Sequence, residues 1–134
     1  MAKLLYDTIK QTDPTRPITN GFNYVSEAFD NNLAFYTDIV GLNYKPQNYG
    51  KYLKQYPNKL FIGSETESCV STRGVYHFPV KIDLGECKNR DLCVSAYDLC
   101  APGWAYYPER ELAAQKDYPQ IMGEFIWTGF DYMG

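Results

Sequence analysis

The chain has 134 residues, a formal net charge of −3 and 16% aromatic residues, with thirteen tyrosines among them. The acidic balance argues against nucleic-acid binding, which needs a basic surface, and the sequence holds no apolar run of about 18 residues that would span a membrane. No signal peptide is visible at the N-terminus. The cellular location therefore stays open, and a longer protein that contains this chain could be periplasmic or secreted.

Helices and short strands alternate along the chain. Apolar residues spaced by three or four indicate the helices, and short apolar runs bounded by Gly, Pro or Asn indicate the strands. This alternation predicts an α/β fold with a parallel sheet and right-handed crossovers. In chain order we expect a helix over Ala2–Thr12, a strand at Ile18–Asn20, a helix over Glu27–Phe35 capped by Ser26, a strand over Asp38–Tyr44, a helix over Gly50–Tyr56, a strand over Leu60–Glu65, a helix over Glu109–Lys116 and a strand over Gln120–Trp127.

Both ends of this pattern predict that the chain is part of a longer protein. It opens within a helix that no strand precedes, and it stops after an apolar strand that no helix covers. A four-stranded open sheet would leave both edges bare, which predicts self-association through those edges. A complete eight-stranded barrel takes about 250 residues, roughly twice the length of this chain.

The stretch Thr66–Tyr107 lacks a regular period, and such long connections are usually functional or mobile. The spacings of Cys69, Cys87, Cys93 and Cys100 match no zinc motif. A disulfide from Cys87 to Cys93 or to Cys100 and a set of free thiols both remain open at this point.

Glu65 stands at the end of an apolar strand, where an ionisable group is unusual because a buried charge is costly. Catalytic groups lie at the C-terminal ends of parallel strands in barrel enzymes. Position alone supports a catalytic carboxylate and a solvated junction acid equally.

Glu67 and Glu124 are the other acids in or beside predicted strands. A retaining glycosidase needs two carboxyl groups about 5 Å apart on opposite sides of the scissile bond. Glu65 and Glu67 on one strand would not bracket a sugar in this way. For Glu124 we expect a structural role, with Arg16 or a lysine as its partner.

Aromatic and polar side chains at the other strand ends are candidate substrate contacts. A hydroxyl on Tyr44, which follows Asn43, would reach the Glu65 carboxylate, and the Trp127 indole would form an apolar floor under a sugar ring. Ordinary packing explains both aromatic residues equally well.

The long loop offers Arg73, Asp98 and Trp104 as further substrate contacts, although structural roles are favoured for each. His77 is the single histidine, and no serine stands in a nucleophile-elbow sequence, so a Ser-His-Asp hydrolase is poorly supported. No phosphate-binding loop, HExxH motif or EF-hand loop is present.

Taken together, these residues resemble the C-terminal half of the catalytic barrel of glycoside hydrolase family 2, the beta-galactosidase and beta-glucuronidase group. The resemblance covers essentially the whole chain and is most specific in its last two segments. The segments are Asp13–Thr19, similar to the junction of the fourth helix and fifth strand; Asp38–Tyr44, similar to the sixth strand; Gly63–Ser68 with Ser71–Tyr76, similar to the nucleophile segment; and Gly123–Tyr132, similar to the eighth strand.

The resemblance implies that residues 1–134 are strands five to eight of a (β/α)8 barrel, without the first half of the barrel or the family's beta-sandwich domains. Glu65 would be the nucleophile, with Tyr44 hydrogen-bonded to it and Trp127 lining the subsite of the cleaved sugar. The family's acid/base is a glutamate after an asparagine, and the chain contains no Asn-Glu pair. Glu67 stands where the family commonly has a small residue.

The implied activity is that of a retaining beta-glycosidase, in first place a beta-galactosidase, acting on a beta-linked oligosaccharide or glycoside. We expect no cofactor, no metal in this portion, and no turnover by the chain alone. Two alternatives remain: a non-catalytic carbohydrate-binding or scaffold domain, and a glucuronidase or mannosidase specificity within the same family.

Overall fold

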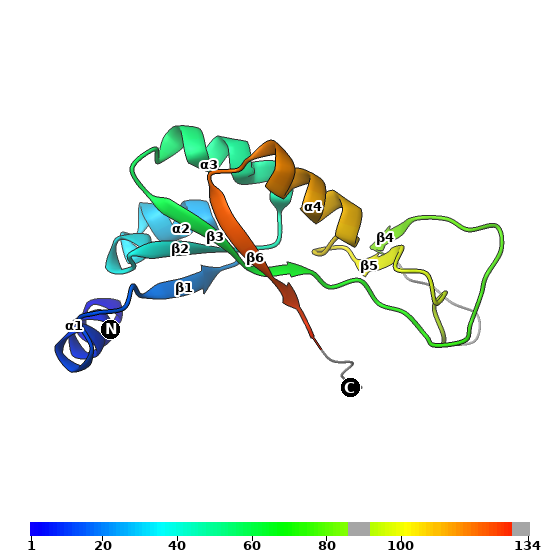
Figure 1. The fold of residues 1–134 in the computed structure, drawn as a ribbon, viewed down its shortest axis with the longest axis horizontal. Coiled ribbons are helices and arrows are strands. Elements are labelled where there is room, and N and C mark those ends of the chain that lie inside the picture. The colour runs from blue at the N-terminus through cyan, green and yellow to red at the C-terminus, as the bar shows by residue number, and fades with distance from the viewer. Residues whose placement is uncertain (86–91, 130–134) are drawn as a thin grey trace.

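A four-stranded parallel sheet with the strand order β1-β2-β3-β6 forms the centre of the fold (Figure 1). The structure is a computed structural model that describes residues 1–85 and 92–129. The strands of this sheet are β1 (Thr19–Phe22), β2 (Ile39–Asn43), β3 (Leu60–Glu67) and β6 (Ile121–Trp127), and the short strands β4 (Asp83–Gly85) and β5 (Cys100–Pro102) pair with each other. The helices are α1 (Ala2–Thr12), α2 (Val25–Asp30), α3 (Tyr49–Gln55) and α4 (Pro108–Asp117), with 3-10 turns η1 (Leu33–Tyr36) and η2 (Pro46–Asn48).

The hydrophobic core lies between this sheet and the helices α2, α3 and α4. In β2 the residues Val40 and Leu42 are buried, as expected for a central parallel strand. Burial of this apolar face stabilises the fold by roughly 25 cal/mol per Å² removed from water. The buried cluster consists of Phe22, Val25, Ala28, Phe29, Ala34, Val40, Leu42, Tyr49, Tyr52, Phe61, Ala114 and Ile121.

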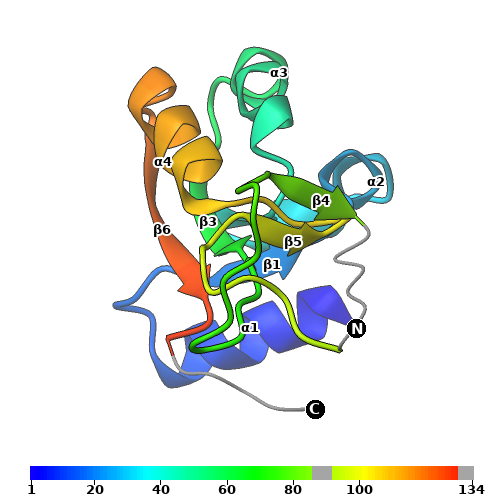
Figure 2. The ribbon, with the colours of Figure 1, turned by 90° about the vertical axis from the view of Figure 1, so that its right-hand side faces the viewer.

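Helix α1 stands apart from this core. Both views place it below the edge strand β1 and away from α3 and α4, and it contributes no buried residue (Figure 2). Its link to the sheet is polar: Lys10 and the hydroxyl of Tyr6 contact the carboxylate of Asp38, which also accepts the backbone N–H of Ile18. These donors, Lys10 foremost, lower the pKa of Asp38 to about 2. No helix within the described ranges has the length and apolar character needed to cross a membrane.

The structure confirms the predicted parallel α/β sheet and the helix over Ala2–Thr12, but the predicted second helix was wrong in extent and cap. The helix begins at Val25, and Ser26 lies inside it without capping it. It ends at Asp30 because the Asn31 side chain accepts the Leu33 N–H and Asn32 adopts a left-handed φ of 65°. Asparagine side chains compete with helical hydrogen bonds in this way.

Two further differences concern β3 and the segment after it. β3 continues two residues beyond Glu65, because Thr66 and Glu67 pair with β6. The segment between β3 and α4, for which no regular structure was expected, contains the β4–β5 pair and extends from the C-terminal end of β3 (Figure 1). Cys100 is disulfide-bonded, and Cys69 and Cys93 are free. Cys87, one of the predicted disulfide partners, lies outside the described residues.

Candidate active site

A cavity of about 450 Å³ opens where the strands of the main sheet end, and Glu65 lines it. The C-terminal ends of parallel strands meet at one edge of a sheet, so side chains distant in sequence converge there. Here the turns after β1 and β2, the last residues of β3 and β6, and the loop before α4 each contribute side chains. The lining residues are Asn23, Tyr24, Asn43, Tyr44, Lys45, Glu65, Trp104 and Trp127.

Tyr44 is fixed to Glu65 by two hydrogen bonds. The Tyr44 hydroxyl donates to Glu65 Oε2 at 3.1 Å, as expected from the sequence, and the Tyr44 backbone N–H donates to the Glu65 carbonyl at 2.7 Å. The hydroxyl of Ser68 lies 3.2 Å from the Tyr44 hydroxyl and donates to the Trp127 carbonyl. One carboxylate oxygen of Glu65 is therefore held by Tyr44, and its side-chain direction is restricted.

Both strands that carry this pair end in left-handed backbone. Tyr44 and Lys45 have φ values of 58°, and Glu67 and Ser68 have φ values of 67° and 64°. For a residue with a Cβ this conformation costs roughly 1–2 kcal/mol. Such strained backbone is concentrated at functional sites, where the surrounding structure maintains it.

Aromatic side chains form the walls of the cavity. Trp104 packs edge-on against Tyr44, with ring centroids 4.8 Å apart, and about half of its surface is exposed. Trp127 and Tyr24 are exposed to 45% and 67%. Exposed rings around a carboxylate suit a sugar, because rings pack against its apolar faces while polar groups bind its hydroxyls.

Sequence reasoning missed three residues of this site: Asn23, Tyr24 and Lys45. Lys45 Nζ donates to the Asn23 carbonyl and lies 4.2 Å from the centroid of the Tyr24 ring. Lys45 directly follows the predicted strand Asp38–Tyr44, so the strand-end argument that selected Tyr44 applies to it as well. Asn23 and Tyr24 follow β1, which ends at Phe22, two residues beyond the predicted strand Ile18–Asn20.

Relatives of the chain are glycosidases. No profile of a known protein family matches the chain, but a search of curated proteins finds a beta-galactosidase, BoGH2A of Bacteroides ovatus, 31% identical across 100% of this chain and 17% of the relative. A solved glycosyl hydrolase family 2 member from Bacteroides cellulosilyticus is 26% identical, with a TM-score of 0.60 over 99% of this chain and 12% of that one. The chain belongs to glycoside hydrolase family 2.

A third relative has another named activity. A calcium-binding mutant of beta-glucuronidase 2 from Bacteroides uniformis is 26% identical to the family 2 chain, with a TM-score of 0.66. The alignment covers 99% of this chain and 16% of that structure. The family 2 chain thus spans less than a fifth of the length of each of these three relatives.

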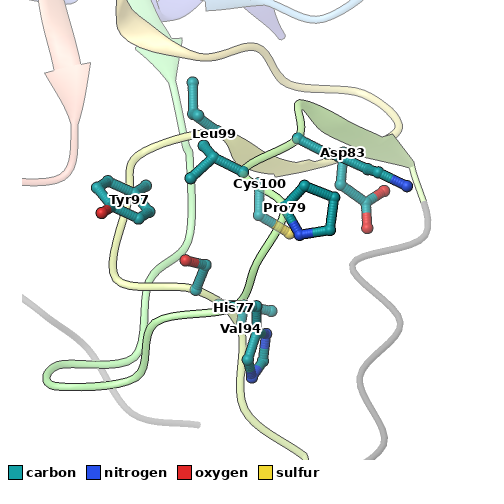
Figure 3. A pocket seen from close by; sticks show the side chains of 10 residues that line it. His77, Pro79, Asp83, Val94, Tyr97, Leu99 and Cys100 are labelled. Carbon is teal, nitrogen blue, oxygen red and sulfur yellow. The ribbon is translucent and has the colours of Figure 1, made fainter.

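Two of the expected substrate contacts lie elsewhere in the family 2 chain. Arg73 and Asp98 are exposed in the segment between β3 and α4, and neither lines the Glu65 cavity. His77 lines a second cavity, of about 190 Å³, together with Tyr97 and Cys100 (Figure 3). This second cavity shares no lining residue with the first.

Glu67 and Glu124 do not line the Glu65 cavity either. The expected pair of Glu124 with Arg16 was wrong, because Arg16 pairs with Asp13, and Glu124 Oε2 is buried without a hydrogen bond in the described part of the chain. Within the same part, no grouping of three His, Cys, Asp or Glu side chains could hold a metal ion.

Instead, Glu67 and Glu124 lie near Glu111 of α4, which is fully buried with neither carboxylate oxygen hydrogen-bonded among the described residues. Burial, with the charges of Glu124 and Glu67 added, raises the pKa of Glu111 to about 7, although the Glu67 backbone N–H offsets part of this effect. Burial also raises the pKa of Glu67, and the charge of Glu124 adds to that shift.

Proposed function

We propose that residues 1–134 are strands five to eight of a (β/α)8 barrel in the catalytic domain of a longer family 2 protein. The parallel strand order β1-β2-β3-β6 with intervening helices supports this. The outer edges of β1 and β6, at the two ends of this order, would then meet strands from the rest of the barrel. The short share of each relative that the chain covers agrees with a partial domain.

We infer that this longer protein hydrolyses beta-galactosides with retention of configuration, and that Glu65 is its nucleophile. A carboxylate oxygen of Glu65 attacks the anomeric carbon as the bond to the leaving oxygen breaks, and that oxygen takes a proton from a glutamate outside this chain. Water then attacks the glycosyl ester, the same glutamate removes its proton, and the sugar and the free Glu65 carboxylate are released.

The observation that carries this proposal is the bond from the Tyr44 hydroxyl to Glu65 Oε2 inside a cavity walled by Trp104 and Trp127. A nucleophile gains rate when its reacting oxygen is held in one orientation. With Oε2 bound by Tyr44, the other oxygen is the one to attack.

A galactoside is favoured over a glucuronide by one feature of the cavity. Lys45 is the single cation among its described lining residues, and its Nζ is already directed at the Asn23 carbonyl and the Tyr24 ring. A uronic acid would require a cation for its carboxylate, whereas galactose is neutral. The beta-glucuronidase relative keeps the glucuronide as a second candidate.

Nitrophenyl beta-galactoside and beta-glucuronide, offered to the longer protein encoded by the full reading frame, test this proposal. We expect faster hydrolysis of the galactoside and a kcat loss of about 10³-fold or more in Glu65→Gln. The matched control is Glu27→Gln, an exposed acid on α2, which should keep full activity. Saturable galactoside binding without turnover, unaffected by Glu65→Ala, would favour a non-catalytic binding domain instead.

A further inference from the structure

Three polar side chains form a continuous hydrogen-bonded line across the C-terminal ends of β1, β2 and β3. Ser64 Oγ donates to Asn43 Oδ1 at 2.6 Å, and Asn43 Nδ2 donates to Asn23 Oδ1 at 3.1 Å. Ser64 belongs to β3, Asn43 ends β2, and Asn23 follows β1. We name these three residues the brace. Since both the oxygen and the nitrogen of the Asn43 amide are engaged, this side chain has one hydrogen-bonded orientation.

The brace occupies space that is free because two residues of the neighbouring strands are glycines without a side chain. A Cβ on Gly41 would lie 2.5 Å from Ser64 Oγ, and a Cβ on Gly21 would lie 2.7 Å from Asn43 Oδ1. Glycine weakens the interior of a strand, and it often marks a point where another group approaches the backbone closely. Both strands therefore lack a side chain at the places where the brace lies against the sheet.

A β-bulge places Glu65 beside the brace. The register of β2 and β3 shifts between Leu42 and Asn43, so that Asn43 pairs with Glu65 and Ser64 is the extra residue. Bulges near active sites redirect side chains in this manner. Directly after this pair, the backbone N–H of Tyr44 donates a hydrogen bond to the Glu65 carbonyl. The brace thus holds the residue before Glu65 and the residue paired with it.

Lys45 anchors the brace at its β1 end. Its Nζ donates to the Asn23 carbonyl while it lies over the Tyr24 ring. The left-handed backbone at Tyr44 and Lys45 turns the chain after β2. The end of β2 consequently contacts Asn23 twice, through the Asn43 amide and through the Lys45 ammonium.

We propose that Ser64 and Asn43 are positioning residues that fix the Glu65 carboxylate for its attack on the sugar. This catalytic consequence rests on the proposed function, while the brace itself does not. The role differs from the substrate contact expected for Asn43. Its Oδ1 and one Nδ2 proton are used within the brace, which leaves one N–H for a ligand.

NMR on the 134-residue chain tests the proposal without any need for turnover. The variants are Ser64→Ala and Asn43→Ala, with Ser71→Ala in the exposed loop as the matched control. In both brace variants we expect the Tyr44 amide to exchange about fivefold to tenfold faster, as the loss of one net hydrogen bond implies. The order parameter of the Glu65 side chain should fall, and the control should match the wild type.

The amides of Val40 and Phe61, both fully buried in the sheet, distinguish positioning from general stability. Their exchange rates should stay unchanged in Ser64→Ala and Asn43→Ala. Equal acceleration at all sites, or no change at Tyr44 together with an unchanged Glu65 order parameter, would overturn the proposal.

A kinetic comparison in an active longer protein separates the brace from the proposed function. There Ser64→Ala should lower kcat about tenfold while KM stays nearly unchanged, because an interaction made in the transition state is lost. NMR changes in the chain with an unaltered kcat in Ser64→Ala would overturn the positioning role of the brace, whereas full activity in Glu65→Gln would overturn the proposed function.

Discussion

Glu111 should make the stability of this chain depend on pH in the opposite direction from that of most carboxylates. Its carboxyl group is fully buried between α4 and the sheet, without a hydrogen bond among the described residues. The groups that face it are Glu67 from β3, Glu124 from β6, the hydroxyl of Tyr49 from α3, which has no hydrogen bond within the described ranges, and Arg110 on its own helix. Burial is the main reason that its pKa is raised from 4.5 to about 7.

The direction and size of the effect follow from this shift. Between pH 4.5 and 7 the folded chain keeps the Glu111 proton while the unfolded chain has lost it, so the free energy of unfolding falls as the pH rises. At 1.36 kcal/mol for each pKa unit, the total loss is roughly 3 kcal/mol. The raised pKa of Glu67 acts in the same direction. Asp38, with a pKa of about 2, titrates below this range.

Urea unfolding, followed by circular dichroism from pH 5 to pH 8, measures this effect. Glu111→Gln keeps the size of the side chain and removes its titration, so the variant should exceed the wild type by about 2–3 kcal/mol at pH 8 and by less than about 1 kcal/mol at pH 5. Glu109→Gln removes the same charge from an exposed position on α4 and should leave the slope with pH unchanged. Parallel profiles for the wild type and Glu111→Gln would refute the reasoning.

Two further predictions concern the chain on its own. Nitrophenyl galactoside should not be turned over by residues 1–134, since no Asn-Glu pair supplies an acid; measurable turnover that Glu65→Gln abolishes would refute this. The chain should also self-associate at micromolar concentration through the outer edge of β6, where Met122, Phe125 and Ile126 are exposed. We expect Phe125→Lys to weaken this association. A single monomeric species of the wild type in sedimentation velocity would contradict the expectation.

The main sheet could be predicted because its strands are short apolar runs separated by helical patterns. The second helix could not be delimited, since the hydrogen bond from the Leu33 N–H to the Asn31 side chain is invisible to apolar spacing. The extension of β3 to Glu67 was also hidden, because polar residues are held there by pairing with β6. The β4–β5 pair depends on contacts between distant short segments, which carry no periodic signal.

The location of the site could be predicted where a residue with distinctive chemistry lies at or near the end of a strand, as for Glu65, Tyr44 and Trp127, which line one cavity. The resemblance to family 2 gave these residues their expected roles. The contact of Lys45 with the β1 end could not be predicted, because it depends on the left-handed turn after β2. The burial of Glu111 was also missed, since helical spacing does not reveal which acid on α4 will face the sheet.

The most direct test of the central claim is to trap the covalent intermediate. The longer protein is treated with a 2-deoxy-2-fluoro-beta-galactoside that carries a good leaving group, digested, and examined by mass spectrometry. A retaining nucleophile forms a long-lived glycosyl ester with such a compound. The account predicts that the sugar is attached to Glu65 and that Glu65→Gln remains unlabelled. Attachment to another carboxylate, such as Glu67, would contradict it.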